Sequence, residues 1–162
     1  DGVNCRRQGS DMSKKDQNHM ALAIEVAEQA GTRDEVPVGA VIVQDGKLLV
    51  RAGNQVEAGN DPTAHAEILA IRAAADMLNA PRLPDCDLYV TLEPCAMCAA
   101  AISFARIRRL YFGAYDVKGG GVEHGARFFG QATCHHAPEV YGGIAESECG
   151  ELLKEFFRNL RD

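Results

Sequence analysis

The segment LYVTLEPCAMCAAAISFARIRRLYF, from Leu88 to Phe112, decides the fold. Its first residues, Leu88–Leu92, form a short apolar run that predicts a β-strand, and Arg109–Phe112 predicts a second one. Between them, Cys95–Ala105 is rich in alanine and predicts a helix. A strand, a helix and a strand within so short a span imply a right-handed crossover that leaves the two strands parallel.

The segments before it extend the sheet. Apolar residues at helical spacing predict a helix over residues 17–30. The apolar runs Val38–Val43 and Leu48–Val50 are separated by a turn that contains Asp45 and Gly46, a combination typical of a β-hairpin. The sequence therefore predicts two antiparallel strands directly after the first helix.

The remaining helices complete an α/β domain. Thr63 is positioned to cap a helix that runs to about Leu78, and an amphipathic helix closes the chain at about residues 147–160. Together these elements predict an α/β domain over residues 18–162, with a mixed sheet of about five strands and helices on both faces. Residues 1–17 predict a polar, disordered tail, or residues foreign to the natural chain.

Composition excludes several classes of protein. A chain of 162 residues predicts one domain, and no apolar run approaches the roughly 20 residues that span a bilayer. The polar N-terminus lacks the apolar region of a secretory signal, so we expect a cytoplasmic protein with reduced cysteines. A net charge of -6 argues against a general nucleic-acid binder. An RNA substrate would require a local basic patch.

Two short motifs predict a metal centre. His65 and Glu67 open one predicted helix, and Cys95 and Cys98 open another with their sulfurs on the same side. Three ligands without a fourth favour a catalytic zinc site, which keeps a position for water. Glu67 would then be the base that takes the water's proton. A Cys-x-x-Cys pair alone would be equally compatible with redox chemistry or structural zinc, and the combination His-x-Glu with Pro-Cys-x-x-Cys is the general signature of zinc deaminases.

From about His19 to Arg161, the chain resembles the cytidine-deaminase-like superfamily and, within it, the bacterial tRNA-specific adenosine deaminases. The resemblance rests on EVPVGAVIV, DPTAHAEILAIRAAA, LYVTLEPCAMCAAAISFARIRRLYFGAYDVKGG and LLKEFFRNLR. It implies the three-layer α/β/α fold of that superfamily and one zinc ion per subunit, held by His65, Cys95 and Cys98. It also implies conversion of adenosine to inosine at the wobble position of a tRNA anticodon loop, by zinc-activated water with Glu67 as proton shuttle.

The resemblance further implies a binding site for the target base and a homodimer with the Cys95 helix near its interface. The matching base-site positions are Asn54, as a hydrogen-bonding partner, and Val36, Pro37 and Leu92, as the lining. The alanines of the Cys95 helix would suit close packing, either between subunits or on the protein's own sheet.

Basic residues near the C-terminus are candidates for contacts with an anticodon stem-loop. Lys154, Arg158 and Arg161 share one face of the closing helix, next to an expected buried stripe of Leu153, Phe156, Phe157 and Leu160. With Lys118, Arg106, Arg108, Arg109 and Arg127 they would supply the positive patch that RNA requires, although such a helix face is more often only a solvated surface.

Three alternatives remain open at this point. The consecutive residues Cys134, His135 and His136 could contribute to a second metal site, but neighbouring side chains rarely converge on one ion. The resemblance implies that this region lies near the RNA, so a surface contact with RNA is the alternative. The enzyme could deaminate a free base or nucleoside, of the guanine or cytosine type. A non-catalytic zinc module that binds RNA or a partner is disfavoured by Glu67, because a structural site has no use for an additional carboxylate.

Overall fold

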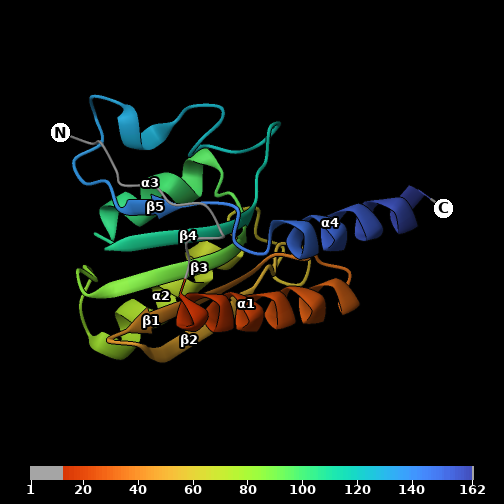
Figure 1. Cartoon of the computed structure of the whole chain (residues 1–162), viewed down its shortest axis with the longest axis horizontal. Helices are drawn as coiled ribbons and strands as arrows, with labels where there is room; N and C mark the ends of the chain where they lie inside the picture. The colour runs from red at the N-terminus through yellow and green to blue at the C-terminus, as the bar shows by residue number, and fades with distance from the viewer. Residues whose placement is uncertain (1–12, 162) are drawn as a thin grey trace.

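The structure, a computed structural model, describes residues 13–161, with side chains as far as Leu160. A five-stranded sheet in the order β2-β1-β3-β4-β5 lies between helices on both faces, so the predicted three-layer α/β/α fold is confirmed (Figure 1). The strands are β1 (Gly39–Gln44), β2 (Lys47–Gly53), β3 (Cys86–Leu92), β4 (Arg109–Ala114) and β5 (Glu139–Tyr141). The helices are α1 (Lys14–Thr32), α2 (Ala66–Leu78), α3 (Ala96–Phe104) and α4 (Glu146–Arg161), with the short 3-10 helix η2 (Phe128–Gly130) after β4.

Alternation along the strands produces two apolar layers. Val41 and Val43 of β1 face α1 and join one buried cluster, whereas Ile42 faces α2 and α3 and joins the other. The same alternation separates Tyr89 of β3 from Leu88. Because successive strand residues point to opposite faces, each strand contributes to both cores. The sheet is therefore covered on both sides and fixes the positions of the helices around it.

The connection that decides the fold has the predicted geometry. Strands β3 and β4 are parallel, with Leu88 opposite Leu110 and Leu92 opposite Ala114. Strands β1 and β2 form the predicted antiparallel hairpin, and its turn residue Gly46 has a positive φ of 78° that suits glycine. Since β3 and β4 end at the same edge of the sheet, the residues that follow them meet there.

The start of α2 differs from the prediction. Thr63 does not cap it: the helix begins at Ala66, and its N-cap residue is His65. The reason is that Asp61 Oδ1 accepts hydrogen bonds from both the amide and the hydroxyl of Thr63, at 2.9 and 2.7 Å. The first amide of α2 instead finds its acceptor far away in the sequence, because Ala66 N donates to Asn54 Oδ1 at 2.8 Å.

Two boundaries also differ from the sequence analysis. Helix α1 begins at Lys14, after Ser13 accepts a hydrogen bond from the Asp16 amide, so residues 14–17 belong to a helix and not to the expected tail. The rest of that tail, residues 1–12, lies outside the described part of the chain. Strand β5 was not predicted, because three residues are too few for a recognisable alternation.

No helix in the described residues is long and apolar enough to cross a membrane.

The apolar stripe of α4 is only partly buried, so the prediction of a fully buried stripe is wrong. The first half of α4 packs on β4, β3 and α1, whereas its second half projects past the edge of the sheet (Figure 1). Leu153 and Phe156 are half-buried, but Phe157 is 44% and Leu160 is 65% exposed. The exposed part of the stripe lies beside the pocket described next.

Candidate active site

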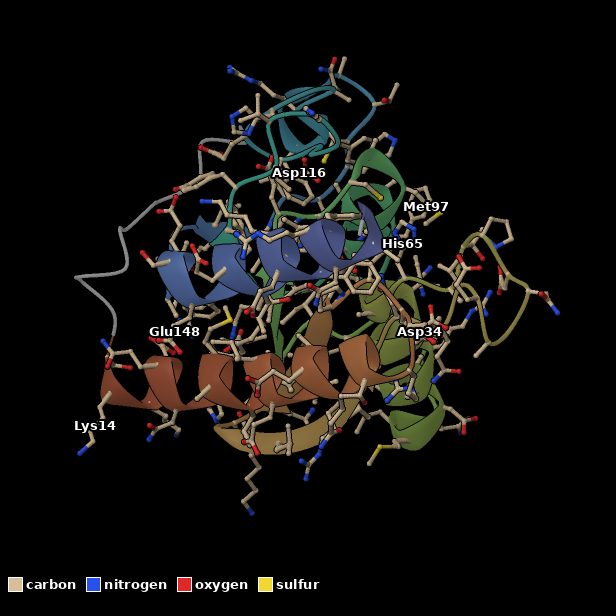
Figure 2. All side chains as sticks on the ribbon, turned by 90° about the vertical axis from the view of Figure 1, so that its right-hand side faces the viewer. Lys14, Asp34, His65, Met97, Asp116 and Glu148 are labelled. Carbon is tan, nitrogen blue, oxygen red and sulfur yellow. The ribbon has the colours of Figure 1, made fainter. Side chains whose placement is uncertain are left out.

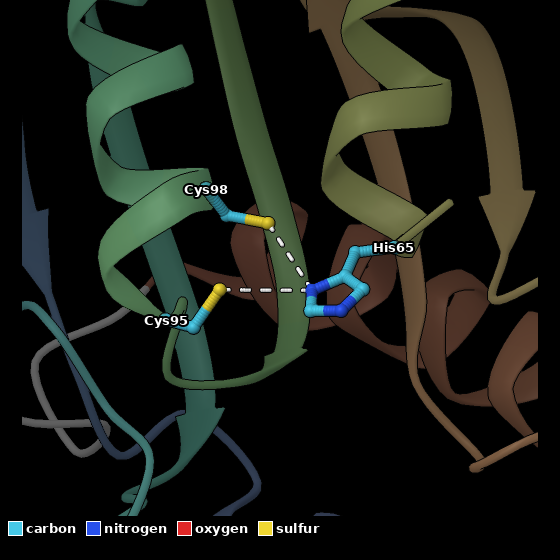
Figure 3. Close-up of side chains that lie close together, drawn as sticks. All are labelled: His65, Cys95 and Cys98. Atoms are coloured by element: carbon cyan, nitrogen blue, oxygen red, sulfur yellow. Dashed lines mark hydrogen bonds between the residues drawn. The ribbon is translucent and has the colours of Figure 1, made fainter. Parts of the chain in front are cut away.

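Three of the predicted site residues meet where α2 and α3 begin. His65 is the N-cap residue of α2, Cys95 is the N-cap residue of α3, and Cys98 lies in the first turn of α3. Figure 3 shows the imidazole of His65 pointing from its own helix towards the two sulfurs. The crossover connection explains this meeting, because α3 starts directly after β3 at the edge that α2 also reaches.

The three ligand atoms are spaced as a zinc ion requires. His65 Nδ1 lies 3.6 Å from Cys95 Sγ and 3.5 Å from Cys98 Sγ, and all three atoms lie within 4.8 Å of one another. A tetrahedral ion at ordinary Zn–N and Zn–S distances separates nitrogen from sulfur by about 3.6 Å. The donor set of two thiols and one imidazole therefore fits zinc, with no fourth protein ligand within the cluster among the described residues.

The contact between the two thiols shifts their pKa values in opposite directions. The hydrogen bond from Cys98 lowers the pKa of Cys95 to about 4, and the neighbouring His65 acts in the same direction. The same interaction, together with burial, raises the pKa of Cys98. His65 in turn has a raised pKa, because it faces the Cys95 sulfur. Because thiolate is the form of cysteine that binds metal, the lowered pKa of Cys95 favours the binding of a cation here.

Glu67 is the fourth member of the group and is not a ligand candidate. It lies in the first turn of α2, is only 4% exposed, and its carboxyl is in hydrogen-bonding contact with Cys98. Burial raises the pKa of Glu67 to about 7. A carboxyl group with such a pKa can both accept and donate a proton near neutral pH.

A pocket of about 760 Å³ opens beside this group. Asn54, Val36 and Leu92, three of the residues expected at a base site, are among its lining residues. Pro37 does not belong to the described lining, because it is buried and its Cβ faces Gly31 at the end of α1.

The rim of the pocket comes from three distant segments of the chain. Asp34, Asp116 and the end of α4 surround His65, as Figure 2 shows for the labelled residues. Asn54 is held in place by the hydrogen bond from Ala66 N, which fixes the orientation of its amide. The pocket therefore has the ligand cluster and Glu67 on one side and an open, partly acidic mouth on the other.

Several lining residues were missed by sequence reasoning. Glu35 and Glu93 are almost fully buried beside the pocket, where their carboxylates accept backbone hydrogen bonds from loops. Phe157 and Leu160 line the pocket although they were expected in the core. The only available signal was the position of Glu93 directly before Pro94 and Cys95, and nothing in the sequence distinguishes Glu35 from a surface acid.

The predicted basic residues do not form one patch. Lys118 lines a hollow of about 520 Å³ that shares its wall with the pocket, and Lys154 and Arg158 are exposed on α4. The side chain of Arg161 lies outside the described part of the structure. Arg108 and Arg109 lie at the opposite end of the sheet, where they pair with Asp87, so their inclusion in this patch was wrong. Arg106 is also tied down there, since its guanidinium donates to the Ser103 carbonyl.

Cys134 and His136 make hydrogen bonds within the fold. His136 Nε2 lies 2.8 Å from the Ile107 carbonyl oxygen, and the His136 carbonyl accepts hydrogen bonds from Ser103 Oγ and Cys134 Sγ. Within the described residues, His65, Cys95 and Cys98 form the only cluster of side chains spaced to hold a metal ion. The alternative of a second metal site therefore has no support in the described chain.

Comparisons with known proteins agree with this geometry. The family described as the cytidine and deoxycytidylate deaminase zinc-binding region matches residues 13–114. The tRNA-specific adenosine deaminase of Agrobacterium fabrum is 64% identical over 142 residues, which cover 88% of this chain and 93% of that protein.

Two solved structures are also similar. One, from a study of A-to-I editing by tRNA:A34 deaminases at the wobble position of transfer RNA, has 64% identity and a TM-score of 0.83, with 84% of this chain and 99% of that chain covered. A guanine deaminase from Bacillus subtilis has 40% identity and a TM-score of 0.60, with 64% and 66% of the two chains covered. The ligand geometry and these likenesses together place the chain in the tRNA-specific adenosine deaminase family of the zinc-dependent cytidine and deoxycytidylate deaminases.

Proposed function

We propose that this protein hydrolyses adenosine to inosine and ammonia at the wobble position of a tRNA anticodon loop. The observation that carries the proposal is a buried carboxyl, Glu67, in contact with three convergent zinc ligands beside an open pocket. The relatives named for this activity on tRNA cover nearly the whole chain, and more of it than the guanine deaminase does. Because tRNA modification in bacteria takes place in the cytoplasm, we also propose a cytoplasmic location for this protein.

The side chains divide the reaction between them. His65, Cys95 and Cys98 would hold a zinc ion, which would supply Lewis-acid activation of the attacking water. Glu67 takes one proton from that water and passes it to N1 of adenine. It then takes the second proton, from the hydroxyl group now on C6, and delivers it to the amine that leaves as ammonia, a sequence that suits a pKa of about 7. Asn54 holds the base by a hydrogen bond, with its orientation set by the Ala66 amide.

The size and character of the pocket support a nucleotide within a chain rather than a free base. Pocket and adjoining hollow share Val36, Leu92, Asp116, Gly119 and Phe157, and thus form a continuous concave surface. Exposed apolar side chains at its mouth offer stacking surfaces for neighbouring bases, which contribute about 1–3 kcal/mol per base in single-strand binding. A loop nucleotide is also easier to extrude than a paired one, because fewer stacking and pairing interactions are broken.

Phosphate contacts would come from two places at this mouth. Lys118 extends from the loop after β4, and Lys154 and Arg158 extend from α4, next to the apolar stripe that lines the pocket. The net charge of the chain is -6, so it would repel RNA. Attraction would therefore depend on the local arrangement of these three cations.

We also propose that the protein acts as a homodimer through the outer faces of α2 and α3. Phe104 on α3 is 69% exposed and Met77 on α2 is 58% exposed, and the small residues Ala96, Ala100 and Ala101 lie on the same outer layer. A contiguous apolar patch at the surface commonly marks an interface between subunits.

A substrate comparison tests the function. An anticodon stem-loop RNA with adenosine at the wobble position is assayed for inosine, alongside the same RNA with guanosine there, and free adenosine, cytidine and guanine. We expect deamination of the adenosine stem-loop alone. Faster deamination of a free base would instead support the function on small substrates. A zinc-loaded protein that deaminates none of these substrates would support the alternative of a non-catalytic zinc module.

A further inference from the structure

Glu93 is a buried carboxylate that the proposed chemistry leaves without a role. It lies between the last residue of β3 and the Pro94–Cys95 pair, and its side chain has no exposed surface. A carboxylate buried in this way is costly unless hydrogen bonds replace its lost hydration. Its partners therefore indicate why the fold keeps it.

Both oxygens of Glu93 are saturated by a single loop. Oε1 accepts from the Asp116 amide at 3.0 Å and lies 2.8 Å from His124 Nδ1. Oε2 accepts from the amides of Val122, Glu123 and His124 at 3.2, 2.8 and 3.0 Å. Five donors from the first and last parts of one loop thus converge on one side chain, which draws the loop into a closed turn.

The glycines of this loop allow its backbone to lie directly on the carboxylate. A Cβ added at Gly120 would lie 2.5 Å from Glu93 Oε2, and one at Gly121 would lie 2.5 Å from the Ala96 amide nitrogen. Gly121 N also donates to the Pro94 carbonyl at 2.8 Å. The triple glycine, which is no phosphate-binding motif, therefore serves a close approach to the start of α3.

This loop forms one side of the substrate pocket. Asp116 and Gly119 line the pocket, and Lys118 lines the hollow beside it. We propose that Glu93 is a positioning residue that holds the 116–124 loop as a pocket wall, in fixed register with the zinc ligand Cys95. The effect on substrate rests on the proposed function, whereas the effect on the loop does not.

The substitution Glu93→Gln tests this assignment, because it keeps the shape but places an NH2 group against backbone N–H donors. Hydrogen exchange measured by mass spectrometry should show selective loss of protection in residues 116–124. Zinc content should stay at one ion per chain. For the stem-loop RNA, we expect kcat/KM to fall by about 10- to 100-fold, because a displaced pocket wall misplaces the substrate, with most of the change in KM.

Two further variants separate positioning from general destabilisation. Asp87→Asn removes a buried carboxylate at the other end of β3, where it pairs with Arg108 at 3.0 Å. It should lower the melting temperature and leave the protection of residues 116–124, KM and kcat unchanged. Gly120→Ala should reproduce the effects of Glu93→Gln, because its new Cβ would displace the loop from an intact carboxylate.

Wild-type protection of residues 116–124 in a folded Glu93→Gln protein would overturn the assignment, as would a loosened loop with unchanged KM. If Glu93→Gln does not fold, the same two measurements on Gly120→Ala decide the question. Hydrogen exchange needs no substrate, so it tests the loop assignment independently of the proposed function. A wild-type protein that fails to act on the stem-loop would refute the proposed function, and hydrogen exchange would still decide whether Glu93 holds the loop.

Discussion

Replacing Glu67 by glutamine should lower turnover by orders of magnitude and leave the metal site intact. The amide has the shape of the carboxyl but cannot carry a proton between water, ring nitrogen and leaving group. A general acid–base residue contributes about 100- to 10,000-fold, equivalent to about 2.7–5.4 kcal/mol of transition-state stabilisation. The two other buried acids in the described lining of the pocket are already engaged and so are not free to compensate for this change. Glu35 and Glu93, the other buried acids at the pocket, already accept backbone hydrogen bonds, and Asp116 accepts one from Gly119.

The measurement combines single-turnover deamination of the stem-loop RNA with zinc analysis and thermal unfolding. Glu67→Gln should retain one zinc per chain, and its melting temperature should not fall, because a neutral amide replaces a desolvated carboxyl. Glu35→Gln serves as the matched control, since Glu35 is equally buried and lines the same pocket, but its carboxylate accepts hydrogen bonds from the Glu57 and Ala58 amides. Its single-turnover rate should exceed that of Glu67→Gln at least tenfold. A Glu67→Gln protein within tenfold of the wild-type rate at full zinc occupancy would show that another group carries the proton.

Further predictions concern the metal, the RNA, the dimer and stability. Cys98→Ala should lose zinc together with activity, and a zinc-free preparation with wild-type turnover would exclude metal catalysis. The double substitution Lys154→Ala/Arg158→Ala should weaken stem-loop binding and flatten its salt dependence by about 0.7–0.9 log units for each phosphate that is no longer neutralised, and equal slopes would remove α4 from the RNA site. Phe104→Glu should give a monomer in light scattering, since this side chain is exposed on the proposed dimer face and a charge there opposes association. Burial lowers the pKa of His19, so the unfolded chain binds the proton more tightly and stability is lost as pH falls below 6.5. His19→Gln should therefore narrow the difference in melting temperature between about pH 7.5 and 5.5.

The sequence predicts the chemical centre better than its surroundings. Cys95 and Cys98 are three residues apart on one helix, and a strand–helix–strand crossover leaves little freedom in where that helix begins. His65 was correctly placed at the start of α2 for a partly wrong reason, because Thr63 was expected to cap the helix. The actual acceptor, Asn54, lies in another segment, and local capping rules do not extend to such distant partners.

The walls of the pocket were missed because long-range hydrogen bonds from side chain to backbone place them. Glu93 collects amides up to 31 positions later in the chain, and Glu35 collects amides up to 23 positions later. Neither acid belongs to a periodic pattern, and each becomes informative only when the loop that it holds is folded against it. The end of α4 was misassigned for a related reason. An amphipathic stripe predicts that something covers it, but not whether the cover is the protein's own sheet or a bound substrate. The sheet does not extend as far as Phe157 and Leu160, so these side chains are not covered by it and line the pocket instead. Their exposed apolar surface is therefore available to the RNA.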